Sequence, residues 1–484
     1  MQPIDIGDLS LDLSKATRQS ALFHAIREKI VRGFWSKGNK LPSTRKLAIE
    51  LDVSRNTVIF AYEQLMSEGY IESRKGAGYF VSIEQPEHYL AAPEPPVETE
   101  DLKGRELSES IGITPFDVNQ GFAPGVPDLR AFPFAKWQRL LQRHVTRLSL
   151  AGNQQVQGSI ALREALSHYL ASSRSVHCDP SRIIITVGAQ QALSMALMAT
   201  LKTGDEVLME EPGYRQVHKI IDLLQLKMQP VPVREKQGLC LDKVLASQAQ
   251  ALYVTPSNQY PMGTTLTTEQ RLKIIDWAKQ NQAWIIEDDY DSEFQFAHRP
   301  YTSMQGLAGK LEQDERVIYV GSLSKVMFNG LRIGYMVVPK QLVPRCLEVK
   351  DAITGDSPTH TQEALADFIN EGDLLRHIRK MRRSYKQKYE AMLTAIESEF
   401  GQDLEVISQA AGLHVTVKWY GGISEHDWSR RAERENIVVR PFSFYEYAKD
   451  NDRDWRSVVL GFGNVPLNEI PQKMRTIAQA FYHE

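Results

Sequence analysis

The sequence contains little cysteine, no long apolar run and little net charge. Its three cysteines, Cys178, Cys240 and Cys346, are too few for a disulfide framework and lack the spacing of a metal site. No apolar run approaches the ~18–20 residues that cross a membrane. The first residues, MQPIDIGDLSLDLSK, lack a signal-peptide pattern. These absences exclude disulfide-rich and membrane-spanning classes, and they favour a cytoplasmic protein.

The net charge of −3 conceals segments of opposite sign. Residues 1–81 contain twelve Lys/Arg and nine Asp/Glu, whereas residues 82–117 contain nine acids, two bases and the run AAPEPPVETED. The second composition is typical of an exposed linker. In residues 118–484, β-branched runs such as RIIITV, ALYVTP and AWIIEDD alternate with amphipathic stretches. This alternation indicates an α/β domain with a mostly parallel sheet.

Three helices and a hairpin are predicted in residues 1–81. The first helix covers QSALFHAIREKIVRG, and the next two follow the N-caps Ser43 and Ser54. YIESRKGAGYFV then predicts a two-stranded wing with a basic, glycine-rich tip. A small helical domain with a solvated charged face would explain any one helix. The ordered set favours a winged helix-turn-helix instead.

This segment resembles the winged helix of the GntR regulator family over most of residues 17–81. The matching residues are LPSTRKLA, VSRNTV, AYEQLMSEGYI and the wing glycines. Guanidinium groups can bond guanine bidentately or lie against phosphate. The resemblance implies a double-stranded DNA operator, with Thr57 near its backbone. The other implied contacts come from Arg45, Arg55, Asn56 and the wing tip of Arg74, Lys75 and Gly76.

A lysine in a serine-flanked turn ends one predicted strand, in the stretch VIYVGSLSKVMFNGLRIGYM. The amine of this residue, Lys325, could form a Schiff base with an aldehyde. Pyridoxal phosphate is the common biological partner of such a lysine. It also needs a phosphate site, an acid opposite its ring nitrogen and an aromatic ring for stacking.

Candidates for each of these parts follow other predicted strands. The turn in TVGAQQAL could hold a phosphate at a helix start, helped by Ser322 and Arg332. Either aspartate of WIIEDDYDSEF could face the ring nitrogen. Each part alone fits an ordinary turn or capping residue, but the set favours a cofactor site. Its members are Gly188, Ala189, Gln190, Tyr214, Asn258, Asp288, Tyr290, Ser322, Lys325 and Arg332.

Residues 118–484 resemble class I aminotransferases of fold type I, through TVGAQQAL, EEPGY, TPSNQYPMG, IIEDDYDSEF, GSLSK, LRIGY and VVRPFSFY. With the winged helix, the whole chain resembles the MocR/GabR group of GntR regulators. The resemblance implies that Lys325 carries the cofactor, Asp288 pairs with its ring nitrogen, and Arg440 binds an effector carboxylate. Asn258 stands where this group commonly has histidine. Asn153 stands near the tyrosine by which the family usually reaches the neighbouring subunit's phosphate.

Three functions remain open at this point. The chain could be a regulator that senses an amine, an amino acid or pyridoxal phosphate itself through external-aldimine formation. It could be a working aminotransferase with an accessory DNA-binding domain, or its cofactor site could be vestigial. We favour the regulator, because a metabolic transaminase needs neither a winged helix nor an acidic linker. The family implies a head-to-tail homodimer, and the sequence indicates neither a metal nor a membrane partner.

Overall fold

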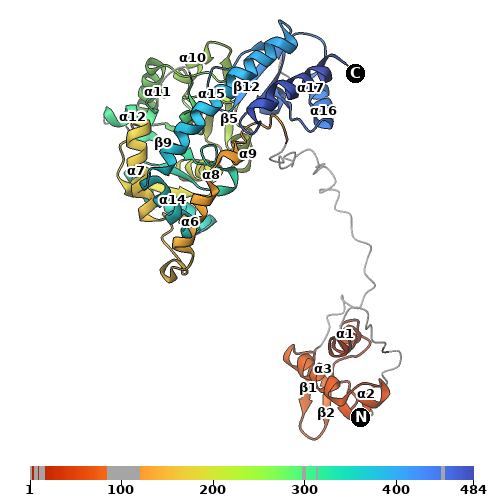
Figure 1. Cartoon of the computed structure of the whole chain (residues 1–484). Coiled ribbons are helices and arrows are strands. Elements are labelled where there is room, and N and C mark those ends of the chain that lie inside the picture. The colour runs from red at the N-terminus through yellow and green to blue at the C-terminus, as the bar shows by residue number, and fades with distance from the viewer. Residues whose placement is uncertain are drawn as a thin grey trace. The chain divides into compact units, whose positions relative to one another are not determined.

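The chain divides into two compact units, Met1–Gly112 and Ile113–Glu484 (Figure 1). This computed structural model describes residues 3–4, 9, 17–83, 120–296, 301–311, 314–447 and 453–483. The predicted linker, residues 82–117, lies outside these ranges except for its first two residues. None of the described helices is both long and apolar enough to span a bilayer.

The N-terminal unit contains the three helices and the hairpin that the sequence predicts. The elements are α1 (Arg18–Val31), α2 (Thr44–Glu50), α3 (Arg55–Ser67), β1 (Ile71–Arg74) and β2 (Gly78–Val81). Each helix begins after a hydroxyl side chain that accepts a backbone N–H, namely Thr17, Ser43 and Ser54. Gly76 and Gly78 have φ of 76° and 107°, so the wing turn uses conformations that favour glycine.

A single apolar cluster holds this unit together. The predicted stripe of α1, formed by Leu22, Phe23, Ile26 and Ile30, is buried in it. From α3, Tyr62 adds a buried ring whose hydroxyl donates to the carbonyl of Pro42 at 2.9 Å. This core fixes the positions of α2 and α3, whose N-terminal ends are exposed.

An eight-stranded sheet forms the centre of the second unit, in the order β3-β10-β9-β8-β7-β4-β5-β6. Strands β5, β4, β7, β8 and β9 run parallel, while β10 and β6 pair antiparallel with their neighbours. The bounds are β3 (Ile183–Thr186), β4 (Glu206–Glu211), β5 (Lys227–Arg234), β6 (Gly238–Leu239), β7 (Ala251–Val254), β8 (Trp284–Asp289), β9 (Val317–Ser322) and β10 (Gly334–Val337). This sheet confirms the predicted mostly parallel α/β class.

Helices cover both faces of the sheet. Successive side chains of a strand point to opposite faces, so neighbouring residues pack against different helices. Ile286 of β8 packs with helices α8, α9 and α13, whereas Ile285 packs with α11 and α12. The described α-helices of this part of the second unit are α6 (Phe134–Val145), α7 (Ile160–Arg174), α8 (Ala189–Thr200), α9 (Arg215–Leu223), α10 (Leu241–Leu245), α11 (Thr268–Asn281), α12 (Met304–Lys310), α13 (Val343–Ile353) and α14 (Thr359–Asn370).

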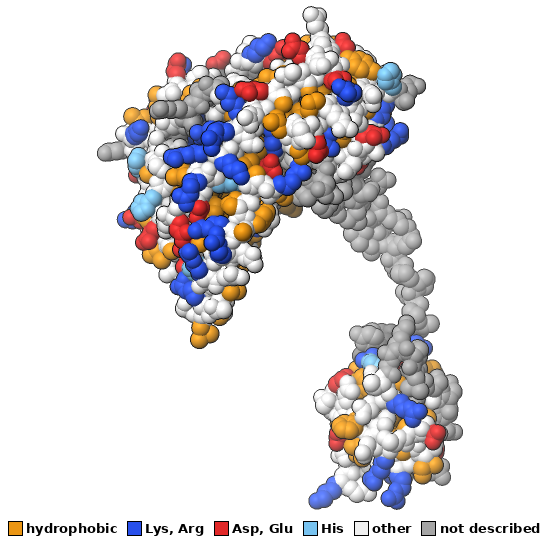
Figure 2. All heavy atoms as spheres, viewed as in Figure 1, with side chains coloured by type: hydrophobic (Ala, Val, Ile, Leu, Met, Phe, Trp, Pro, Cys, Tyr) orange, Lys and Arg blue, Asp and Glu red, His pale blue; other side chains and the backbone are white. Residues whose placement is uncertain are grey.

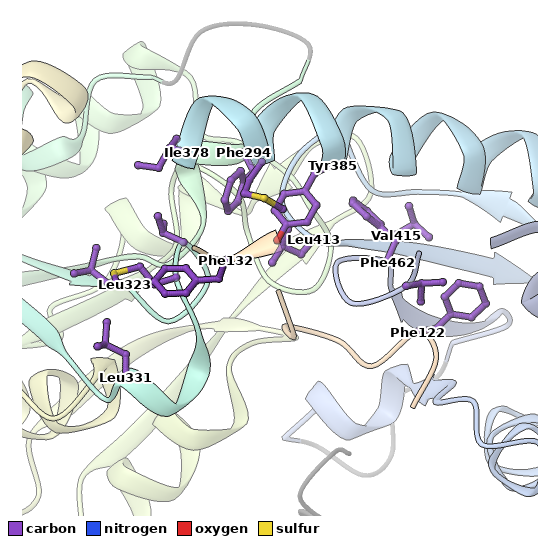
Figure 3. Packing of buried hydrophobic residues seen from close by; sticks show 14 of the residues in the cluster. Phe122, Phe132, Phe294, Leu323, Leu331, Ile378, Tyr385, Leu413, Val415 and Phe462 are labelled. Carbon is purple, nitrogen blue, oxygen red and sulfur yellow. The ribbon is translucent and has the colours of Figure 1, made fainter. Parts of the chain in front are cut away.

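A long helix, α15 (Asp373–Phe400), leads to a smaller antiparallel sheet of order β11-β12-β14-β13. The rings of Phe294 and Tyr385 meet beneath α15 at 4.9 Å between centroids (Figure 3). The remaining elements are β11 (Glu405–Val406), β12 (His414–Trp419), α16 (Glu425–Arg434), β13 (Arg440–Pro441), β14 (Arg456–Gly461) and α17 (Ile470–Tyr482). One apolar cluster thus joins the smaller sheet to the large one.

Candidate functional site

A cavity of about 300 Å³ opens at the carboxyl ends of strands β4, β7, β8 and β9. Ligands of open parallel sheets bind at this edge. Eight residues that the sequence singles out line it: Ala189, Gln190, Tyr214, Asp288, Tyr290, Ser322, Lys325 and Arg332. Sequence patterns missed the other lining residues: Pro124, Gly125, Tyr253, Thr255, Tyr260, Asp291, Ser324, Asn329, Leu413 and His414.

Lys325 enters the cavity three residues after the wholly buried strand β9. Its Nζ donates a hydrogen bond to the carbonyl oxygen of Gly125. Burial lowers the pKa of the Lys325 ammonium to about 8, although the carboxylates of Asp291 and Asp288 act in the opposite direction. A neutral amine is therefore accessible near physiological pH, as nucleophilic chemistry requires.

Asp288 ends strand β8 and presents its carboxylate to the same cavity. The hydroxyl of Tyr253 donates to Asp288 Oδ2 at 2.9 Å. Burial raises the pKa of Asp288 to about 7, and the Tyr253 hydrogen bond partly offsets this effect. Such a carboxylate would be stabilised by a cationic partner, so its protonation state depends on what occupies the cavity.

Asp289, the next residue, points to the other side of β8. Its Oδ2 accepts from Arg174 Nε at 2.6 Å and from the hydroxyl of Tyr319 at 2.5 Å. Arg174 also donates to Ser257 Oγ at 3.1 Å, and the Arg174–Asp289 pair is buried. This network connects α7, β8, β9 and the loop after β7. These contacts fix the end of β8, and therefore the position of Asp288, on the side of the strand that faces away from the cavity.

A candidate anion site lies where helix α8 begins. Gly188 is its N-cap with φ of 80°, and the first helical residues, Ala189 and Gln190, line the cavity. A helix N-terminus favours negative charge through its free N–H groups and its dipole. Arg332 donates to the carbonyl of Val187 at 3.0 Å, so its guanidinium lies beside this turn. Ser322 and Ser324 add hydroxyls to the cavity lining that are hydrogen-bonded to each other at 3.0 Å.

Two further polar groups follow Asp288 and Asp289 along the chain. Tyr290 and Asp291 both line the cavity, and Asp291 Oδ1 accepts from Asn258 Nδ2 at 2.9 Å. Burial raises the pKa of Asp291 to about 8, although the Asn258 hydrogen bond lowers it. A side chain at Gly412 would collide with Asp291 and Asn258, so this backbone approach requires glycine. Asn258 itself borders the cavity through Asp291 rather than lining it.

Arg440 does not line the cavity. Its guanidinium lies over the ring of Phe444, 4.7 Å from the centroid, and Arg215 lies over the same ring at 4.5 Å. Tyr445 connects this segment to the cavity, because its hydroxyl is 2.8 Å from that of the lining residue Tyr260. The predicted carboxylate-binding role of Arg440 thus stays a prediction.

The predicted DNA-facing residues occupy one end of the N-terminal unit's helices and its wing. Arg45, Arg55 and Asn56 are exposed at the starts of α2 and α3, and Arg55 Nε lies 3.4 Å from Thr44 Oγ1. Arg74, Lys75 and Gly76 are exposed at the wing tip. Thr57 is only 7% exposed, and its hydroxyl lies 2.8 Å from Ser54 Oγ. Thr57 therefore stabilises the start of α3, and its predicted position near DNA stays a prediction.

Comparisons with known proteins identify both parts of the chain. Residues 18–81 match the family "Bacterial regulatory proteins, gntR family", and residues 123–456 match "Aminotransferase class I and II". A relative from Rhizobium meliloti, "Probable rhizopine catabolism regulatory protein MocR", is 33% identical over 95% of this chain and 93% of its own length. This chain belongs to the MocR group of GntR-family regulators.

Two further comparisons support this assignment of the regulator. The "HTH-type pyridoxine biosynthesis transcriptional regulator PdxR" of Corynebacterium glutamicum is 31% identical over 76% of each chain. Among solved structures, LysN of Thermus thermophilus, an α-aminoadipate aminotransferase complexed with N-(5'-phosphopyridoxyl)-L-leucine, has a TM-score of 0.68 and 25% identity. That match covers 75% of this chain and 92% of LysN. The predicted fold class, a winged helix followed by a fold-type I aminotransferase domain, is confirmed.

The cavity of this regulator fits the cofactor that its fold family uses. Two lining residues, and Asn258 behind the lining residue Asp291, each have a buried polar atom without a hydrogen-bond partner among the described residues: Asp288 Oδ1, Tyr290 Oη and Asn258 Oδ1. Buried polar atoms are normally satisfied, so these three indicate a polar ligand. At Gly188, a Cβ atom would lie 3.2 Å from the Arg332 guanidinium, and the positive φ of 80° also favours glycine at this position.

Proposed function

We propose that this regulator holds pyridoxal 5'-phosphate in the cavity at Lys325 and binds double-stranded operator DNA through its winged helix. Its effector is a small amine, an amino acid or the cofactor itself. One observation supports the proposal: a lysine, a buried aspartate, a tyrosine and a helix N-terminus beside an arginine line one cavity of a GntR-family chain.

Each residue has a distinct task in this proposal. Lys325 would attach the cofactor, Asp288 would face its ring nitrogen, and Tyr214 would lie against its ring. The cradle residues Gly188, Ala189, Gln190, Ser322 and Arg332 would hold its phosphate. Tyr290 and Asn258 would bind its 3-oxygen. When bound, the cofactor supplies an aldehyde for amines and a ring that accepts electron density.

Effector binding would release Lys325 from its attachment and change the groups that it contacts. An effector can alter DNA binding only if it binds two states of the regulator with different affinities. The same coupling is reciprocal, so DNA should change the effector's affinity by an equal factor. Arg440 would select a carboxylate or a similar anion on the effector.

A second candidate function is transamination by the same cavity. It is favoured by one observation, the position of Lys325 in the same cavity as the carboxyl groups of Asp288 and Asp291, because an amine whose pKa burial lowers to about 8 can also accept and donate protons near neutral pH. Binding and reaction would use the same residues. The two functions therefore differ in whether the amino group stays on the effector or is transferred.

The test is the visible absorption spectrum of the purified protein with pyridoxal phosphate, as amino acids and amines are added singly. We expect a lysine-linked band in the wild type and in Lys310→Ala, an exposed lysine at the end of α12, and no such band in Lys325→Ala. A sensor's effector shifts the band and changes DNA affinity without consuming the aldehyde. Conversion of the cofactor to its amine form, reversed by an oxo acid, would establish the enzyme. A wild-type protein without the band would refute the cofactor proposal.

A further inference from the structure

Helix α15 carries a segment that is rich in basic residues and free of acidic ones. Between residues 374 and 389, LLRHIRKMRRSYKQKY, there are seven Lys/Arg and no Asp or Glu. The whole chain has a net charge of −3, so this run is a local concentration of positive charge rather than a general property.

The helix separates these residues by face. Leu374, Ile378, Met381 and Tyr385 are buried on its inner side, together with Lys388, which pairs with Asp128 at 2.8 Å. The outer side exposes five basic residues, called here the α15 basic face: Arg376, Arg379, Lys380, Arg383 and Lys386. Figure 2 shows Lys and Arg side chains gathered on this side of the second unit, where Figure 1 draws α15.

Two basic residues of helix α6 form ion pairs that neutralise their charge, and they serve as a comparison for α15. Lys136 pairs with Glu371 at 2.5 Å and with Asp373 at 3.3 Å, and Arg143 pairs with Asp367 at 3.3 Å. On the α15 basic face, Arg376 pairs with Asp373 at 2.6 Å and Lys386 lies 3.9 Å from Glu390.

The centre of the α15 basic face lacks such partners. Among the described residues, Lys380 donates a single hydrogen bond, to the carbonyl of Ala131 at 3.4 Å. Arg379 and Arg383 make no hydrogen bond or ion pair with any residue that the structure describes. The middle of the face is thus available for an external anion.

We propose that the α15 basic face contacts the phosphate backbone of the DNA that the regulator binds. From Arg376 to Lys386 the helix rises about 15 Å, a length of duplex that carries about nine phosphate charges. Guanidinium and ammonium groups are suited to phosphate oxygens. The proposal rests on the DNA-binding function proposed above and adds a second contact surface to it.

The chemistry of the face favours nucleic acid over a protein partner. A stable protein interface usually has a buried apolar or aromatic centre. Here the residues interspersed with the basic ones are polar, as with Ser384 and Gln387, and the exposed Leu375 lies at the edge. A surface of positive charge without an apolar centre suits a sequence-independent phosphate contact.

The experiment compares full-length variants on a fluorescent mixed-sequence duplex of about 60 base pairs between about 50 and 200 mM salt. The test variant changes Arg379, Lys380, Arg383 and Lys386 to Gln. The matched control changes four exposed lysines elsewhere on the same unit to Gln: Lys202, Lys227, Lys243 and Lys279. A third variant, Arg45→Ala with Arg55→Ala, removes the proposed winged-helix contacts. Thermal unfolding checks that all variants are folded.

We expect the α15 variant to bind about tenfold or more weakly at low salt. Its log–log salt slope should be shallower by about 0.9 for each phosphate that the variant no longer neutralises. The matched control should bind like the wild type. Equal losses in both variants, or no loss in either, would overturn the assignment. A change in oligomeric state without a change in DNA affinity would assign the face to a second copy instead.

The two proposals fail in different ways. If Arg45→Ala with Arg55→Ala weakens binding and the α15 variant does not, only the α15 contact is wrong. If the wild type shows no salt-dependent DNA binding at all, the proposed DNA-binding function is wrong as well.

Discussion

Lys325 shares its cavity with two carboxylates, Asp288 and Asp291, and with the buried imidazole of His414. Burial lowers the pKa of His414 to about 4, so this ring is neutral near pH 7. Burial also raises the pKa values of both aspartates. The charge at Lys325 is therefore set by competition between burial, which favours the neutral amine, and the two acids, which favour the ammonium.

This competition predicts the pH dependence of cofactor attachment. The pKa of Lys325 is depressed to about 8, so its reactive neutral form falls about tenfold for each pH unit below that value. The rate at which the lysine-linked band appears should rise up to about pH 8 and then level off. Because the pKa of Asp291 is itself raised to about 8, its carboxylate charge develops only towards the top of this range, and in Asp291→Asn the loss of that charge should move the upper part of the rise to lower pH.

Stopped-flow absorption at a series of pH values measures the midpoint. Asp276→Asn, which changes an exposed carboxylate on α11, should leave it where it is in the wild type. An upward shift in Asp291→Asn would show that Asp291 does not act on Lys325 through its charge.

At the scale of elements, strand ends and helix starts converge on the same edge of the large sheet. The start of α8 is the most constrained of them, because Gly188 adopts a left-handed conformation beside Arg332. The proposed cradle for an anion would therefore depend on the absence of a side chain at Gly188.

Gly188→Ala should weaken pyridoxal phosphate binding about tenfold or more and lower the free energy of unfolding by about 1–3 kcal/mol. The reasons are the positive φ and the close approach of a new Cβ to the Arg332 guanidinium. Cofactor titration and chemical denaturation measure the two effects. Gly309→Ala is the matched control, since a Cβ at this position of α12 meets nothing within 4 Å and replaces a poor helix former. Equal effects at both glycines would contradict the cradle.

At the scale of the whole molecule, a homodimer would present two winged helices to two operator half-sites. Residues 145–160, from the last residue of α6 to the first of α7, expose large apolar side chains, which is typical of an interface: Leu148 is 87% exposed, Val145 62% and Ile160 58%. The same segment contains the exposed Asn153, near the position where the family usually reaches the neighbouring subunit. We infer that it belongs to the subunit interface.

Leu148→Asp should therefore raise the dissociation constant of the dimer by about tenfold or more, because a carboxylate would be buried without a partner. Sedimentation equilibrium measures the change. Leu223→Asp on α9, where leucine is 80% exposed, is the control. A Leu148→Asp protein that dimerises like the wild type would exclude this segment from the interface.

The parts of the fold and cavity that could be predicted from sequence are those with a local signal. Lys325, Asp288 and the turn at Gly188 each follow directly on a β-branched run, and Ser43 and Ser54 precede amphipathic helices. Asp291 had such a signal too, as an acid next to Tyr290 at a strand end, and was overlooked.

Other contacts had no local signal. Gly125 meets Lys325 from 200 positions away in the chain. Tyr253, which holds Asp288, looks like a core residue of a wholly buried strand. Thr57 could be placed on α3, but only packing shows that it turns inward to Ser54.

The end of strand β8 has a consequence for comparing sequences. Asp288 faces the cavity and Asp289 faces the buried Arg174, although the two residues are chemically identical and adjacent. An alignment shifted by one position around this strand end would still pair an aspartate with an aspartate at one of the two sites. The alignment score at that site would therefore not reveal the shift. Such an alignment would nevertheless transfer the role of one carboxylate to the other. In distant relatives that keep a single acid here, the partner retained with it, either a tyrosine like Tyr253 or an arginine like Arg174, identifies which of the two has survived.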